Sequence, residues 1–71
     1  MKLTYDETVD ALYIRFIDAP VECIVSRLND RFAVNFGPDN VVVGIEVLDA
    51  SEVIAGIRDR KVRLENLTVA P

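Results

Sequence analysis

The sequence predicts a single small α+β domain: an antiparallel β-meander of four to five strands, one short helix and an extended C-terminal tail. Three observations support this. Apolar and polar residues alternate over most of residues 2–48, which is the two-residue period of half-buried strands. Clusters rich in Asp, Asn, Gly and Pro separate these runs, as turns require. After residue 48 the apolar spacing becomes helical, and 71 residues suffice for one domain only.

The first two strands are predicted to form a hairpin. Leu3 and Tyr5 share one face of a short first strand, and residues 6–10 supply the polar residues of a turn. Residues 11–16 then place every second apolar side chain on one face. The second strand should end before Pro20, because proline cannot donate a hydrogen bond to a ladder.

Two further strands are expected before the loop at Gly37. Residues 21–27 alternate less regularly but still favour a strand, in which Cys23 is expected to be a buried thiol. Residues 28–30 form a turn, since Asn and Asp tolerate left-handed backbone angles. Residues 31–36 carry aromatic and aliphatic side chains at alternate positions.

The fifth predicted strand, residues 41–48, contains Gly44, and the presence of a glycine inside a strand needs an explanation. Strict alternation puts Gly44 on the outer face, together with Val42, Glu46 and Leu48. Glycine weakens a strand, so its presence predicts a β-bulge or the close approach of another element or a second subunit. The apolar residues beside it make this outer face unusually hydrophobic.

A helix over about residues 50–60 and a tail over 61–71 complete the prediction, after a sheet over about 2–48. Asp49 is placed to cap the helix, with Glu52 at capping-box spacing and Ser51 as a competing cap. The tail alternates again. It has three possible positions: along the sheet edge of its own chain, along the edge of a neighbour, or as a continuation of the helix.

Composition narrows the classes of function. The chain has 12 acidic and 8 basic residues, a net charge of −4, one cysteine and no histidine. This balance disfavours nucleic-acid binding, and we expect no cofactor. No apolar run approaches the ~20 residues of a membrane helix and no signal peptide is visible, so we expect a cytoplasmic protein without membrane contact. A weaker alternative is nucleic-acid contact through a local basic cluster: Arg58, Arg60, Lys61 and Arg63.

Acidic residues are the only candidates in the sequence for catalytic residues or metal ligands. Asp6, Glu7 and Asp10 fall in one turn and offer oxygen ligands to a divalent cation, which gives the alternative of a small metal-dependent enzyme. Turn chemistry alone also explains them. Glu46 is a candidate general acid or base, but pairing with Arg15 of a neighbouring strand is the favoured interpretation. We therefore assign no catalytic, cofactor-binding or metal-binding residue, and lean against an enzyme.

The favoured function is a non-enzymatic interaction module that acts as a homodimer. So small a core is marginal alone, and burial of the apolar outer face or the tail against a second copy would enlarge it. The alternative partner is another small protein, because chains as short as this one also act in antitoxin-like pairs. The expected interface residues are Val42, Gly44, Leu48, Leu64, Leu67 and Val69.

Two separated motifs resemble the DUF2283 family of small bacterial and archaeal proteins. The first runs from Tyr5-Asp6 through Asp10 to Leu12-Tyr13-Ile14 and Phe16, and the second covers residues 44–51, beginning Gly44-Ile45-Glu46. The family often has an Asp-Glu-Asp-Gly type turn before the second motif, where this chain has Gly37-Pro38-Asp39-Asn40. The resemblance implies a compact sheet-plus-helix domain, without an established active site.

Overall fold

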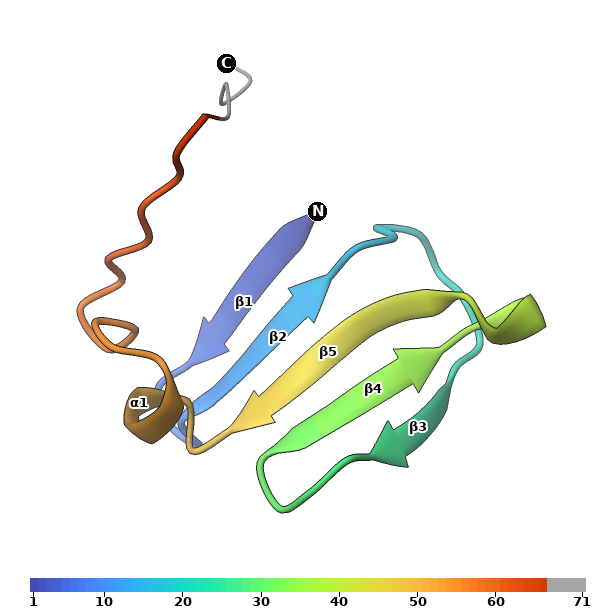
Figure 1. Cartoon of the computed structure of the whole chain (residues 1–71), viewed down its shortest axis with the longest axis horizontal. Coiled ribbons are helices and arrows are strands. Elements are labelled where there is room, and N and C mark those ends of the chain that lie inside the picture. Colours follow the sequence, from blue (N-terminus) through green and yellow to red (C-terminus); the bar gives the residue numbers. More distant parts are fainter. Residues whose placement is uncertain (67–71) are drawn as a thin grey trace.

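The computed structural model describes residues 1–66 and consists of one five-stranded antiparallel sheet with a short helix at one end (Figure 1). The strands are β1 (Lys2–Asp6), β2 (Ala11–Arg15), β3 (Ile24–Arg27), β4 (Phe32–Phe36) and β5 (Val42–Leu48). A 3-10 turn, η1 (Pro38–Asn40), precedes β5, and the helix α1 (Ala50–Val53) follows it. The predicted fold class, an antiparallel sheet followed by one short helix, is confirmed.

The strand order is β1-β2-β5-β4-β3, which differs from a simple meander. Consecutive strands pair within β1–β2 and within β3–β4–β5, but β2 pairs with β5 and not with β3. The last strand therefore lies at the centre of the sheet. Residues 16–23 connect β2 to the opposite edge, and Phe16 and Ile17 anchor this crossover by donating backbone hydrogen bonds to the Val43 carbonyl, at 2.8 and 3.3 Å.

The third strand is shorter than predicted, and the prediction for Cys23 is wrong. All four residues of β3 are exposed, because β3 is the outermost strand. Cys23 precedes it and is exposed as well, with its thiol donating to the Val21 carbonyl at 3.3 Å. Strand alternation alone did not reveal that no strand or helix of residues 1–66 covers this edge of the sheet.

The helix is also shorter than the expected span of residues 50–60. Ile54 already has an extended backbone, and Gly56 has φ +80°, so the chain continues in turns after Val53. These turns bring Ile57 back to the sheet, where it is buried with Leu12, Val47 and Ala50. This core cluster therefore lies at one end of the sheet, on the face that α1 covers. Ala33, which is also buried, lies on the other face.

Gly44 lies beside a β-bulge and under an aromatic ring. Asn35 pairs with Gly44 but the next residue, Phe36, pairs with Val42, so Val43 is an extra residue in β5. A Cβ atom on Gly44 would lie 2.6 Å from the Ile14 carbonyl oxygen and 3.0 Å from the Tyr13 hydroxyl. Both alternatives, a bulge and a close approach, are thus present, and the approaching group belongs to the neighbouring strand.

The bulge changes which side chains share a face. We call the side that carries Leu12, Val47 and Phe32 the core face, and the other side the back face. Because Phe36 pairs with Val42, the register places Val42 on the core face, whereas Gly44 lies on the back face opposite Asn35. The prediction that Val42 and Gly44 share a face is wrong, because the extra residue interrupts the alternation.

Candidate functional site

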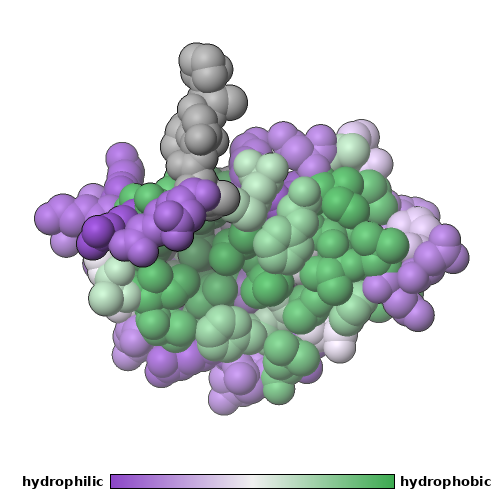
Figure 2. All heavy atoms as spheres, turned by 45° about the horizontal axis from the view of Figure 1, so that its top comes forward, coloured by the Kyte–Doolittle hydropathy of each residue, from purple (hydrophilic) through white to green (hydrophobic). Residues whose placement is uncertain are grey.

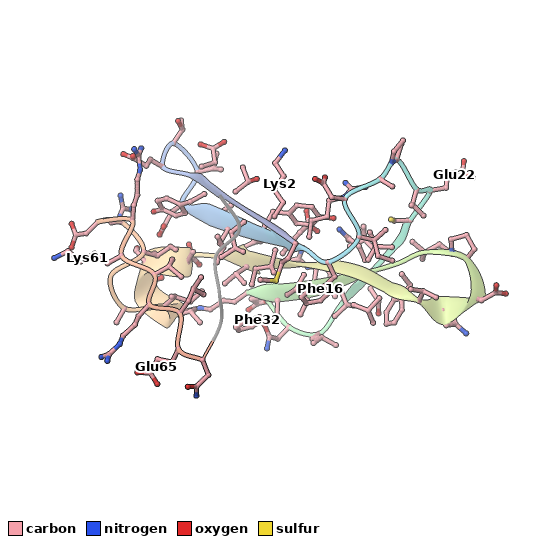
Figure 3. The ribbon with its side chains drawn as sticks, turned by 90° about the horizontal axis from the view of Figure 1, so that it is seen from above. Lys2, Phe16, Glu22, Phe32, Lys61 and Glu65 are labelled. Carbon is pink, nitrogen blue, oxygen red and sulfur yellow. The ribbon has the colours of Figure 1, made fainter. Side chains whose placement is uncertain are left out.

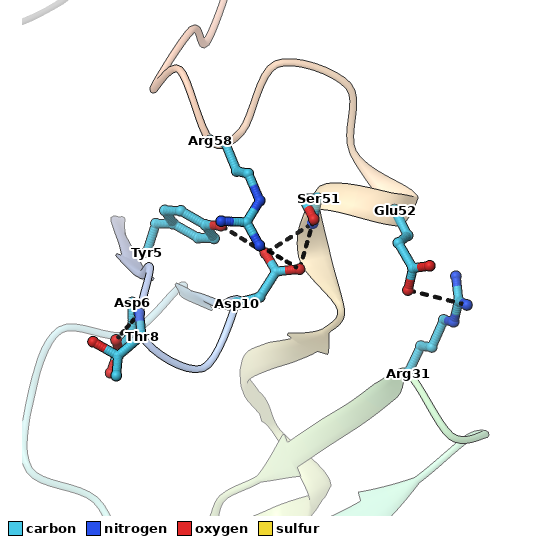
Figure 4. A network of polar contacts seen from close by, with 8 residues as sticks. All are labelled: Tyr5, Asp6, Thr8, Asp10, Arg31, Ser51, Glu52 and Arg58. Carbon is cyan, nitrogen blue, oxygen red and sulfur yellow. Dashed lines mark hydrogen bonds and ion pairs between the residues drawn. The ribbon is translucent and has the colours of Figure 1, made fainter.

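Asp10 is the centre of a polar network that joins the β1–β2 turn to α1 (Figure 4). Its carboxylate accepts hydrogen bonds from the Tyr5 hydroxyl at 2.6 Å, the Ser51 amide at 3.0 Å and the Ser51 hydroxyl at 2.6 Å. The Arg58 guanidinium lies 3.6 Å from the same carboxylate. The Asp10 carbonyl also accepts from the Ala50 amide at 2.9 Å. One residue thus binds the beginning of α1 through both its main chain and its side chain.

The network shifts the pKa values of two of its members, Asp10 and Tyr5. The Ser51 hydroxyl first, and then the Tyr5 hydroxyl, hold the pKa of Asp10 below its ordinary value by hydrogen bonding to the ionised carboxylate. The hydrogen bond to Asp10 in turn raises the pKa of Tyr5, because the neutral phenol is the form that donates. Near neutral pH the Asp10 carboxylate is therefore ionised and the Tyr5 hydroxyl is protonated. Such a pair suits a structural contact, and it is poorly matched to proton transfer at that pH.

The cap of α1 differs from the predicted one. Asp49 occupies the N-cap position with φ 50°, but its side chain makes no capping hydrogen bond. Glu52 instead forms an ion pair with Arg31 at 3.4 Å. The carboxylate that accepts from the Ser51 amide comes from Asp10, which is distant in sequence. No local pattern predicts this cap, although its two halves lie in the two motifs that carry the family resemblance.

The predicted acidic turn does not converge on one point. Asp6 accepts from the Thr8 amide at 2.9 Å, Glu7 pairs with Arg60, and Asp10 is engaged in the network described above. Over residues 1–66, no three His, Cys, Asp or Glu side chains are grouped so as to hold a metal ion. The geometry gives the metal-dependent alternative no support.

The basic cluster is largely neutralised by carboxylates. Arg58 pairs with Asp10 and Arg60 with Glu7, while Arg63 lies 3.1 Å from Glu65. Three of the four cations thus have acidic partners, which weakens the field that would attract phosphates. Lys61 is exposed.

Arg15 binds backbone carbonyls of the crossover in place of the predicted partner, Glu46. Its guanidinium donates to two carbonyls of the crossover, that of Ile17 at 2.7 Å and that of Ala19. In the strand register Glu46 stands opposite Tyr13 and Ala33. Arg15 therefore helps to hold the connection between β2 and β3.

The most distinctive surface is an apolar area on the core face that α1 does not cover. It consists of Ile24, Val34, Phe36 and Val42, which we call the open patch. Ile24 is 78% exposed, Val42 is also exposed, and Val34 and Phe36 are half-buried. Figure 2 shows continuous hydrophobic surface on this side of the molecule, and Figure 3 shows Phe32 on it and Lys2 on the opposite side.

Within residues 1–66, no charged residue is on the core face of a strand. The register assigns to this face Leu3 and Tyr5 of β1, Leu12 and Ile14 of β2, Ile24 and Ser26 of β3, Phe32, Val34 and Phe36 of β4, and Val42, Ile45 and Val47 of β5. An uncharged face with large exposed side chains on a monomer is typical of an interaction surface.

The expected interface residues occupy different surfaces. Val42 belongs to the open patch. Gly44 is buried beneath Tyr13, and Leu48 is exposed opposite Ala11 on the back face. Leu64 is exposed in the segment after the last turn, while Leu67 and Val69 lie outside the described residues. Strict alternation missed the larger apolar surface because it treated the core face as wholly covered.

Comparisons with known proteins identify a family but no characterised relative. A family model described as "Protein of unknown function (DUF2283)" matches residues 2–51, which is most of the chain. That match spans all five strands and ends at Ser51, so it includes both sides of the Asp10–Ser51 contact. Searches of curated proteins and of solved structures gave no match. In residues 1–66, no helix has the length and hydrophobicity needed to cross a membrane.

Proposed function

Since this chain belongs to the DUF2283 family, whose function is unknown, we propose its role from its own surface: it is a protein-interaction module that acts as a homodimer. The observation that supports the proposal is the open patch, an apolar area on a single-layered sheet. A sheet that is apolar on one face normally packs that face against a second layer. Here α1 covers one end of the face only, and a second copy supplies the missing layer.

Charge favours this face over the others for self-association. Two copies of a chain with net charge −4 repel each other. The core face has no charged strand residue, so its burial leaves no carboxylate or ammonium group without solvent. Two such sheets would pack face to face about 10 Å apart, as in a β-sandwich.

Neighbouring residues of β3 provide a matched test. Ile24 and Val25 are both exposed, at 78% and 54%, but they stand opposite Phe36 and Asn35 and so lie on opposite faces. We expect the wild-type protein to have the mass of two chains by light scattering after size exclusion. Ile24→Asp should give a single chain, because it would bury a carboxylate in the interface, and Val25→Asp should stay dimeric.

A wild-type protein that is monomeric at ~100 µM would contradict the proposal, since that concentration exceeds the Kd of ordinary stable dimers. Equal effects of the two substitutions would contradict the choice of face. Because both side chains are exposed in the single chain, each variant should fold, which circular dichroism checks.

A further inference from the structure

The segment after the last turn, residues 61–65, has the pattern of a strand without the pairing of one. Its exposed Val62 and Leu64, at 56% and 50%, alternate with Lys61, Arg63 and Glu65. The Lys61 amide donates to the Gly56 carbonyl at 3.1 Å. Beyond it, no backbone hydrogen bond joins residues 62–65 to any other part of the described chain. Their amides and carbonyls are free to pair.

The free edge of β1 lies near the start of this segment. Within residues 1–66, β1 is the outermost strand on one side of the sheet, so half of its backbone groups have no strand partner there. A hollow of about 240 Å³ adjoins it, lined by Leu3, Tyr5, Leu12, Ile57, Arg60 and Val62. Figure 1 shows the segment running upward beyond the outer edge of β1, opposite to the direction of β1. Figure 3 shows Glu65 on the core-face side of the sheet and Lys2 on the opposite side, so the end of the segment lies in front of the sheet. Val62 is the residue of the segment that lines the hollow beside β1.

One antiparallel register gives complementary pairs at all positions of the two sequences but one. If Val62 stands opposite Tyr5, then Leu64 stands opposite Leu3, and both apolar pairs lie on the core face. On the back face, the same register places Lys61 opposite Asp6 and Glu65 opposite Lys2. The remaining position sets Arg63 against Thr4. Opposite charges therefore meet at both ends of the pairing, with apolar contacts between them.

Neighbouring registers are less favourable. A shift of two residues in one direction places Arg63 opposite Lys2, which sets two like charges side by side. The opposite shift places Asn66 opposite Leu3 and leaves Lys61 and Val62 beyond the end of β1. A shift of one residue turns the apolar side chains to the polar face.

We propose that residues 61–65 dock along the free edge of β1 in the same chain, as a sixth strand in this register. The occupant is the chain's own segment because Val62 already lines the hollow beside Leu3 and Tyr5. The docked strand pairs the backbone groups of β1 and extends the core face by Val62 and Leu64. This role requires no second copy and is independent of the proposed homodimer.

Exchanging the charges at one end of the pairing tests the register. Only every second amide of an edge strand points to its neighbour, so hydrogen exchange of alternate amides within residues 62–65 should be slowed at least about tenfold relative to an unstructured peptide. Lys2→Glu should remove much of this protection and lower Tm by a few degrees, because it sets two carboxylates opposite each other. Adding Glu65→Lys to Lys2→Glu should restore both values. Glu65→Lys alone should resemble Lys2→Glu.

The measurements are made in the wild-type chain and in Ile24→Asp, so that the strand is assessed with and without self-association. Protection that is equal in the two, and independent of protein concentration, supports docking within one chain. Protection that disappears on dilution would mean that a second copy supplies the segment, and would overturn the proposal. Exchange at the unstructured rate, or failure of the double variant to recover, would also overturn it.

Discussion

At the scale of single residues, Gly44 shows how a missing side chain allows a particular packing. The Tyr13 ring lies across this position and its hydroxyl accepts a hydrogen bond from the Asn35 side chain at 2.6 Å. Asn35 is buried, and Gly44 stands opposite it on β5. The aromatic ring therefore reaches from β2 across β5 to β4 through the space that a Cβ atom would fill.

Gly44→Ala should lower the free energy of unfolding by about 1–3 kcal/mol, the usual cost of overpacking. The new methyl group would lie 2.6 Å from the Ile14 carbonyl, a backbone atom that cannot rotate away. Urea denaturation measures the change.

A free energy of unfolding that Gly44→Ala leaves unchanged would show that contact with the Ile14 backbone does not constrain this position.

At the scale of elements, α1 depends on a contact from another part of the chain. A helix of four residues has almost no stability of its own, because it completes hardly more than one turn. Asp10 supplies the missing partners, accepting from the Ser51 amide and hydroxyl and from the Ala50 amide. The turn between β1 and β2 thus determines where the chain after β5 begins its helix.

This contact predicts acid sensitivity. Because the pKa of Asp10 is lowered on folding, its contribution to stability is complete above the unfolded value of about 3.8 and is lost as the pH falls below it. Asp10→Asn should therefore flatten the decline of Tm between about pH 5 and pH 2. Thermal unfolding followed by circular dichroism at several pH values measures this slope.

Two further variants, Ser51→Ala and Gly44→Ala, show whether a change in the slope of Tm with pH comes from Asp10 or from a general loss of stability. Ser51→Ala removes the hydrogen bond that contributes most to the lowered pKa of Asp10, so it should flatten the slope in part. Gly44→Ala should lower Tm at every pH and leave the slope unchanged. A wild-type slope in Asp10→Asn would show that this carboxylate does not carry the acid dependence.

The elements also show what sequence can and cannot predict. Local alternation was sufficient to locate the strands, because a half-buried strand must repeat every two residues. It did not determine their order, since a meander would pair β2 with β3 and the sheet pairs β2 with β5. It failed at Val42, where the extra residue of a bulge reversed the parity, and at the cap of α1, where Asp10 replaced Asp49. Both failures arise from contacts between segments far apart in the chain, which no local pattern contains. The helix was overestimated because Ile54 and Gly56 take non-helical angles.

At the scale of the whole molecule, the candidate surface depended on topology. Whether β5 is central or at an edge, and which end of the sheet α1 covers, decide where the apolar side chains remain exposed. The sequence contains Ile24, Val34 and Phe36 as alternating apolar residues but says nothing about what lies over them. The position of the open patch therefore required the arrangement of all five strands.

The proposed homodimer predicts a stability that depends on protein concentration. Association with a folded partner stabilises the native state by mass action, so Tm should rise by a few degrees for each tenfold increase in concentration. Differential scanning fluorimetry over a hundredfold range measures this rise. Ile24→Asp should abolish it and Val25→Asp should preserve it.

The central place of β5 has a consequence for biosynthesis. The hairpin of β1 with β2 and that of β3 with β4 are local, but they share no edge and meet only through the last strand to be translated. A nascent chain that has emerged only as far as residue 40 holds two separate ribbons, and such ribbons are marginal in water. Stable folding therefore waits until the ribosome has released the stretch up to Leu48, when one strand joins both halves in a single cooperative event.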